Sequence, residues 1–102
     1  MLPHTPRPLT GKQNRYLRGL GHKLRPVVMI GKHHMSEEVI RATDEALVAH
    51  ELIKVRIQEG CLEDRQSVAG DLARQTGAVV VQILGNTFLL YRPSDQALIT
   101  LP

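Results

Sequence analysis

The segment that decides the fold lies near the C-terminal end, where residues 78–92 have the sequence AVVVQILGNTFLLYR. Two apolar runs flank Gly85-Asn86, a dipeptide typical of a two-residue hairpin turn, with glycine first as type II′ geometry prefers. Pro93 follows the second run and ends it, because proline has no N–H to donate to a neighbouring strand. We therefore predict an antiparallel pair of strands on either side of the turn.

Upstream of the hairpin, helix signals alternate with strand signals. Asp64 is a suitable N-cap, and Gly77 a suitable left-handed C-cap, for a helix whose buried face includes Val68 and Leu72. Residues 52–58 alternate between apolar and polar side chains, which predicts a half-buried strand with Ile53, Val55 and Ile57 on its inner side.

A second helix is predicted to begin at Ser36, with Glu37 and Glu38 in the first turn, where the helix dipole favours acids. Its expected buried face consists of Val39, Ile40, Thr43, Ala46, Leu47 and His50. The continuous apolar run at residues 27–30 predicts a buried strand before this helix.

The first helix is expected to run from an N-cap at Thr10 to about Leu24, since Pro26 excludes further helix. One face, predicted to be buried, carries Tyr16, Leu17, Leu20 and Leu24. The opposite face carries a basic stripe at helical spacing, made of Arg15, Arg18, His22 and Arg25. Gly19 and Gly21 each weaken the helix by about 1 kcal/mol relative to alanine, so tertiary packing must hold it.

The order of elements is therefore α-β-α-β-α-β-β. Strands that alternate with helices, followed by a hairpin, predict one compact α/β domain (α+β, two-layer) with a mixed four-stranded sheet. We place this domain at residues 9–102, after a flexible tail at residues 1–8, and expect residues 98–101 to add a short extended piece.

Charge is unevenly distributed along the chain. The first 35 residues hold seven Lys and Arg and no Asp or Glu, whereas the remaining residues hold six and ten, for a net charge of +3. Four of the five histidines also lie in the first 35 residues. This asymmetry indicates a polyanion as partner of one face. The alternative is a solvated basic face that binds nothing.

The loop Gly31-Lys32-His33-His34 joins the first strand to the second helix. Backbone N–H groups at a helix N-terminus suit a phosphate, and glycine allows a close approach of its backbone. The alternative is an ordinary strand-to-helix turn with solvated side chains. The loop is not a P-loop, because His33 stands where that motif requires Ser or Thr.

Other classes of function find little support in the residues. No nucleophile–base motif indicates an enzyme, and adjacent histidines such as His33 and His34 rarely chelate one metal ion. We expect no cofactor, no small-molecule substrate and no membrane association, and nothing demands more than a monomer. His50 is expected to be a histidine at the edge of the core with a hydrogen-bond partner. The lone Cys61 cannot form an internal disulfide, and the first residues lack the apolar core of a signal peptide, so the expected location is cytoplasmic.

Aromatic residues are scarce, which argues against recognition of single strands by aromatic stacking and favours contacts to the phosphates of structured RNA. Twelve residues are predicted to make these contacts. From the first helix and its end they are Lys12, Arg15, Arg18, His22, Lys23 and Arg25; from the loop Gly31, Lys32, His33 and His34; and, if their strand face is open, Lys54 and Arg56.

Three blocks of the sequence resemble the CRM domain (chloroplast RNA splicing and ribosome maturation), and in particular its bacterial stand-alone, YhbY-like form. The first block begins with Thr10-Gly11-Lys12-Gln13 and continues through Leu17-Arg18, His22 and Pro26-Val27-Val28 to Ile30-Gly31-Lys32. The other two are the string from His50 to Arg56, and Gly77 with Val81-Gln82, Gly85 and Leu90-Tyr91-Arg92-Pro93. The resemblance covers about residues 9–93.

This resemblance implies a fold similar to the C-terminal domain of translation initiation factor three. It also implies RNA binding, with ribosomal RNA in precursors of the large subunit as the target and ribosomal proteins as possible neighbours. The family's Gly-x-x-Gly loop, analogous to the KH-domain loop, falls on residues 31–34, where His34 replaces the second glycine. The alternative function is a protein-binding adaptor for ribosomal proteins or assembly factors, whose basic face meets an acidic protein.

Overall fold

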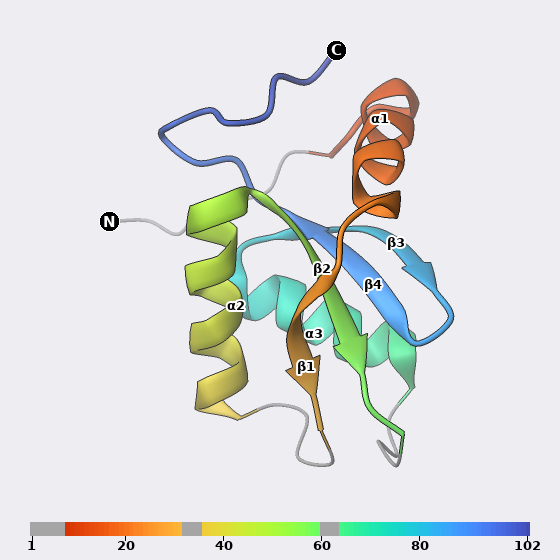
Figure 1. Ribbon diagram of the computed structural model, residues 1–102, viewed down its shortest axis with the longest axis vertical. Coiled ribbons are helices and arrows are strands. Elements are labelled where there is room, and N and C mark those ends of the chain that lie inside the picture. The colour runs from red at the N-terminus through yellow and green to blue at the C-terminus, as the bar shows by residue number, and fades with distance from the viewer. Residues whose placement is uncertain (1–7, 32–35, 60–63) are drawn as a thin grey trace.

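The computed structural model describes residues 8–31, 36–59 and 64–102, which form three helices and one sheet (Figure 1). The elements are α1 (Gly11–His22), β1 (Pro26–Ile30), α2 (Glu37–His50), β2 (Leu52–Ile57), α3 (Arg65–Thr76), β3 (Val79–Leu84) and β4 (Thr87–Tyr91). The order is the predicted one. Within the described residues, no helix is both long enough and apolar enough to cross a membrane.

The four strands form a mixed sheet in the order β1-β2-β4-β3. β1 lies parallel to β2, whereas β4 is antiparallel to both of its neighbours, β2 and β3. The predicted hairpin joins β3 to β4 through Gly85 and Asn86. Gly85 has a φ of 59°, while Asn86 is not among the residues with positive φ, which is the pattern of a type II′ turn.

Local capping signals set the helix boundaries as predicted. The hydroxyl of Thr10 accepts from the N–H of Gln13, and the Gln13 side chain accepts from the N–H of Thr10, which completes a capping box. Ser36 and Asp64 accept in the same way at the start of α2 and α3. Gly77 ends α3 in the left-handed region, with a φ of 69°.

Helices α2 and α3 cover one face of the sheet and build the main core. The inward side chains of β2, Ile53, Val55 and Ile57, are all buried there, as their alternation predicted. Helix residues Leu47 and Leu72 lie in the same core and are fully buried. Figure 1 shows α3 behind the sheet, α2 beside its β1 edge, and α1 apart from both helices at the upper right.

The opposite face of the sheet is covered only at one end. There α1 packs against β2 and β3, and the C-terminal segment 93–102 lies beside it. The small core at this end consists of Leu17, Leu52, Val81, Leu89 and Tyr91, with Leu9, Ile99 and Leu101 against it. The rest of this face, which we call the open face, carries Val27, Met29, Lys54, Arg56, Gln82, Leu84 and Thr87.

One strand prediction needs correction. The run at residues 27–30 is not a fully buried strand, because β1 lies at the edge of the sheet and turns Val27 and Met29, 53% and 51% exposed, to the open face. Residues 98–101, which were predicted to add a short extended piece, lie outside the sheet, and the Glu51 side chain accepts hydrogen bonds from the N–H groups of Leu98 and Ile99.

Candidate nucleic-acid interface

The predicted basic stripe lies on α1 and on the short connection from α1 to β1. Arg18 is half-buried, and the other five residues of this stretch are exposed: Lys12, Arg15, His22, Lys23 and Arg25. The helix ends at His22, two residues before the predicted end, because the N–H groups of Lys23 and Leu24 both turn back to the carbonyl of Gly21. The cations therefore gather at the α1 end of the molecule.

Packing of Leu17 and Gly21 fixes which way α1 faces. These two residues are one helical turn apart and are the buried positions of the helix. Gly21 lies so close to β4 that a Cβ atom there would be 2.3 Å from Cδ1 of Leu89. Arg18 and His22 each follow one of these buried positions, so they are turned by about 100° from the sheet and toward solvent.

The predicted apolar face of α1 is wider than the face that is buried. Tyr16, Leu20 and Leu24 are 43%, 39% and 37% exposed, so the prediction that they would be buried with Leu17 is wrong. The physical reason is the close contact at Gly21, which seats the helix on a narrow line of the sheet and leaves its flanks uncovered. Apolar side chains consequently stand within the basic surface.

Lys54 and Arg56 lie on the open face of β2, where the sequence placed them. Arg56 is exposed and Lys54 is half-buried. Lys54 and His22 line the same small hollow, together with Gln82 and Thr87 from the hairpin strands. The structure thus brings the end of α1 and the open face together, although 32 positions separate His22 from Lys54 in the sequence.

Gly31 follows β1 directly, at the end of the strand away from α1 (Figure 1). The carbonyl of Ile30 accepts from the N–H of Gln58 at 2.8 Å, and a Cβ atom on Gly31 would come within 3.3 Å of the Gln58 side chain. The predicted contacts of Lys32, His33 and His34 lie outside the described residues. Gly31 and the basic end of α1 are therefore separate places, about 15 Å apart along β1, joined by the open face.

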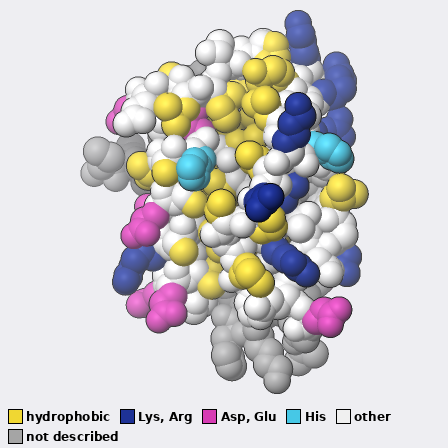
Figure 2. Space-filling model, viewed as in Figure 1, with side chains coloured by type: hydrophobic (Ala, Val, Ile, Leu, Met, Phe, Trp, Pro, Cys, Tyr) yellow, Lys and Arg dark blue, Asp and Glu magenta, His cyan; other side chains and the backbone are white. Residues whose placement is uncertain are grey.

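Electrostatics favour an anion on this surface. Figure 2 shows Lys and Arg side chains along the α1 side and down the centre of this view, a hydrophobic band beside them, and acidic side chains at the outer edges. Among the described residues, the ion pairs are Arg74–Asp71 and Arg92–Asp44, and neither involves α1 or the open face. Within that part of the chain, the cations of the surface are thus not neutralised by protein carboxylates.

Glu51 is a buried carboxylate that sequence reasoning missed. It follows α2 with a φ of 66° and is fully buried. Its side chain accepts hydrogen bonds from the hydroxyl and N–H of Ser94, and from the N–H groups of Leu98 and Ile99 at 2.9 and 3.1 Å. The carboxylate thereby holds the C-terminal segment against the sheet. The available signal was an acid placed directly after a helix C-terminus, where the dipole disfavours it.

The hydrogen bonds to Glu51 also set its charge state. Burial by itself raises the pKa of Glu51, but the hydrogen bonds from Ser94, Leu98 and Ile99 outweigh burial, and the net pKa lies below its ordinary value of 4.5. Burial, and then the negative charge of Glu51, raise the pKa of Tyr91. Glu51 is therefore an ionised structural group and does not contribute to the basic surface.

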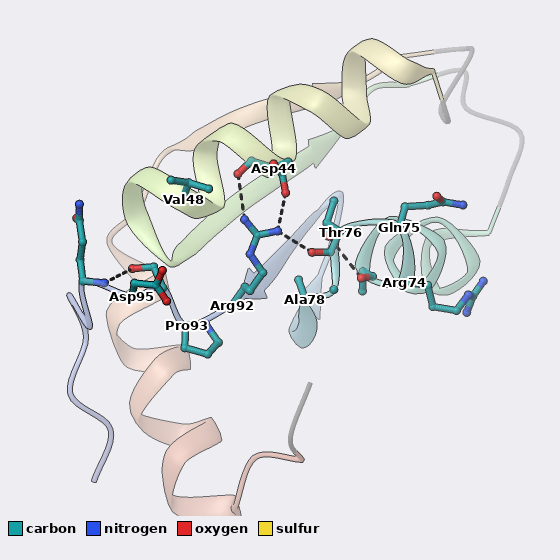
Figure 3. Close-up of a pocket in the computed structure, with 13 residues that line it drawn as sticks. Asp44, Val48, Arg74, Gln75, Thr76, Ala78, Arg92, Pro93 and Asp95 are labelled. Atoms are coloured by element: carbon teal, nitrogen blue, oxygen red, sulfur yellow. Dashed lines mark hydrogen bonds and ion pairs between the residues drawn. The ribbon is translucent and has the colours of Figure 1, made fainter. Parts of the chain in front are cut away.

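Another hollow lies between α2, the end of α3 and residues 92–96, and has a volume of about 930 Å³. Figure 3 shows the guanidinium of Arg92 inside it, where one nitrogen lies 2.6 Å from Asp44 Oδ1 and 2.7 Å from the carbonyl oxygen of Thr76. The Arg92 side chain therefore links the end of β4 to α2 and α3 through these hydrogen bonds. With both signs of charge on its walls, this hollow does not suit a polyanion.

Two further expectations concern single residues. His50 is exposed at the end of α2, so the prediction of a histidine at the edge of the core is wrong; its side chain lines a groove described below. Cys61 lies outside the described residues, as do His33 and His34. Within the described ranges, no three His, Cys, Asp or Glu side chains come together in a group that suits a metal ion.

Fold and surface together define a class: a small α+β module with a basic helix across one end of a mixed sheet and one face of that sheet left open. The chain belongs to the CRS1 / YhbY (CRM) domain family, whose model matches residues 9–92. The resemblance seen in the sequence is thus confirmed.

Several relatives match nearly the whole chain. An RNA-binding protein of Haemophilus influenzae is 43% identical over 94 residues, which are 92% of this chain and 95% of that protein. Probable RNA-binding protein YqeI of Bacillus subtilis is 42% identical over 86% of this chain and 92% of its own length. The solution structure of the hypothetical protein SAV1595 from Staphylococcus aureus matches with a TM-score of 0.78 at 39% identity, covering 92% of this chain and 99% of that one.

Proposed function

We propose that the protein is a non-catalytic RNA-binding module that holds the phosphate backbone of structured RNA on α1 and the open face. The observation that carries this proposal is the cationic surface, which is free of carboxylate partners within the described residues. The names of the relatives, among them an RNA-binding protein of Haemophilus influenzae, support RNA as the polyanion.

The geometry favours backbone contacts over the reading of base edges. The cations stand on α1 and on the open face of the inner strand β2, at the ends of long side chains, which suits phosphates spaced along a nucleic-acid strand. The open face carries no aromatic side chain among its described residues, so stacking of the kind used by RRM sheets has no platform there. Gly31 and the loop residues Lys32, His33 and His34 are proposed to hold a further stretch of backbone beside the N-terminus of α2.

The target that we propose is ribosomal RNA in precursors of the large ribosomal subunit, in the cytoplasm. This part of the proposal rests on what the resemblance to the CRM domain (chloroplast RNA splicing and ribosome maturation) implies, and the family model matches residues 9–92. A single module of this size can contact one RNA element as a monomer, with neighbouring ribosomal proteins at its edges.

The test is RNA binding across a salt series. If five phosphates are contacted, the logarithm of affinity falls with the logarithm of salt at a slope of about −4.5, and raising salt from about 50 to 200 mM weakens binding about 500-fold. The variant Arg15→Gln with Lys23→Gln removes two exposed cations from the surface and is expected to bring the slope to about −2.7.

The matched control is Arg41→Gln with Arg65→Gln, two exposed cations on α2 and α3. Both double variants lower the net charge from +3 to +1, so a difference between them reports position and not total charge. Equal loss in the two variants, or no binding of ribosomal RNA fragments at low salt, would contradict the proposed surface and leave the adaptor function as the better explanation of the charge.

A further inference from the structure

A groove of about 410 Å³ lies where the end of α1, the start of β1, the start of β2 and the C-terminal segment meet. Its apolar wall is formed by Leu20, Leu24, Val27 and Ile99. We call this the apolar groove. It opens on the same side of the molecule as the open face, because Val27 and Lys54 belong to both.

The exposure of this wall is unusual for large aliphatic side chains. Val27 is 53% exposed, and its neighbours Leu20 and Leu24 exceed a third. Val27 lies where the pairing of β1 with β2 shifts register, between Pro26 and Val28, and such bulges re-aim a side chain. Exposed apolar side chains that gather in one place, as opposed to being scattered singly, mark an interaction site.

Two cations border the apolar wall. Arg25 lines the groove from the α1–β1 connection and Lys54 from β2, His50 adds a polar ring from the end of α2, and the lining includes no Asp or Glu. The one carboxylate next to it in sequence, Glu51, is turned to the backbone of the C-terminal segment. The occupant of the groove must therefore be both apolar and anionic.

Two kinds of chain meet that description: an acidic amphipathic peptide and a nucleic-acid strand. A peptide helix in a groove requires an uninterrupted apolar stripe for its anchors at every third or fourth position. Here Lys54 interrupts the apolar surface, because it lines both the apolar groove and the hollow that contains His22. A nucleic-acid strand alternates apolar bases with anionic phosphates at every step, which matches a surface that alternates in the same way.

We propose that the apolar groove receives one or two unpaired nucleobases of the bound RNA, while Arg25 and Lys54 hold the flanking phosphates. This inference rests on the proposed function and deepens it. The module would then select structured RNA in which a bulge or a helix end places unstacked bases next to the paired region. Aliphatic side chains would supply the contact to the base faces.

The experiment compares three RNA hairpins with the full chain: a perfect duplex stem, the same stem with a two-nucleotide bulge, and that bulge with both bases removed. The bulged hairpin is expected to bind about tenfold more tightly than the other two, the lower end of what one stacked base contributes. Val27→Ser is expected to reduce this preference about fivefold, since burial of its exposed half is lost. The affinity of the same variant for the perfect stem is the reference against which its preference is measured.

Val48→Ser is the matched control, because Val48 is 56% exposed on α2 and lies outside the groove. It should keep the full preference for the bulge. Equal affinity of the unaltered protein for all three hairpins would overturn the inference and leave the proposed function intact. If Val27→Ser keeps the full preference for the bulge, the inference is also overturned, because the bases must then bind outside the groove. A protein partner would then be the better explanation of the groove. Absence of binding to every hairpin at low salt would overturn both proposals.

Discussion

Gly19 and Gly21 lie two residues apart on α1, and the structure predicts opposite effects when each is replaced by alanine. At Gly19 an added Cβ would have no neighbour within 4 Å, so Gly19→Ala should stabilise the fold through helix propensity, by about 1 kcal/mol. At Gly21 the added Cβ would lie 2.3 and 2.7 Å from the two methyl groups of Leu89. Contacts that short require the leucine or the helix to move.

The magnitude at Gly21 follows from where Leu89 can go. Its side chain is only 3% exposed and is packed in the small core with Leu17 and Tyr91, so it has little room to turn away. Overpacking of such a site costs about 1–3 kcal/mol. Because both alanines gain the same helix propensity, the difference in unfolding free energy between Gly19→Ala and Gly21→Ala isolates this steric cost.

Urea unfolding followed by circular dichroism measures that difference, provided that the slope with denaturant stays the same in both variants. Leu89→Ala supplies the control: combined with Gly21→Ala it should be less destabilising than the sum of the two single changes, because the new methyl group fills space vacated by the leucine. Equal or greater stability of Gly21→Ala relative to Gly19→Ala would refute the reasoning that the close contact seats α1 on the sheet.

Three further predictions concern stability. Glu51→Gln should lower the unfolding free energy by about 2 kcal/mol, because a neutral amide accepts weaker hydrogen bonds than a carboxylate. Since folding lowers the pKa of Glu51, the stability that its charge contributes is fully present above pH 4.5 and is lost as the pH falls through the lowered pKa. The NMR chemical shift of the Ile99 amide, followed across pH, would report this titration. Arg92→Lys should cost about 1–2 kcal/mol in urea unfolding, because the single lysine nitrogen cannot replace both guanidinium nitrogens, of which one contacts Asp44 Oδ1 and the Thr76 carbonyl and the other contacts the Asp44 carbonyl. Gly77→Ala should lower the melting temperature by about 4–8 °C, the equivalent of about 1 kcal/mol, because its φ of 69° strains any residue with a Cβ.

Features that depend on a few neighbouring residues were predictable from the sequence. The caps at Thr10, Ser36 and Asp64, the left-handed Gly77 and the turn at Gly85 each follow from local backbone chemistry, and each is observed. The mixed sheet follows from the hairpin together with the alternation of helices and strands. The predicted fold is confirmed, and it could be predicted because each of these signals depends only on neighbouring residues.

Burial on α1 and β1 was not predictable, because it depends on where distant elements meet. The sequence does not reveal that β1 is an edge strand, and a run of four apolar residues looks the same at an edge as in the centre of a sheet. Nor does it reveal that α1 rests on Gly21, which leaves Leu20 and Leu24 exposed. The apolar groove arises from these two facts. The roles of the twelve predicted RNA-contacting residues remain predictions for the binding experiments.

The partners of Glu51 also bear on where this module can be cut. The family model ends at residue 92, but Ser94, Leu98 and Ile99 donate to the carboxylate from beyond that boundary. A shortened chain that stops at residue 92 would retain every helix and strand, yet it would lose the donors to Glu51 and the side chains of Ile99 and Leu101 that pack on the small core. The last ten residues thus belong to the folding unit, and a transplanted copy of this module must carry them along.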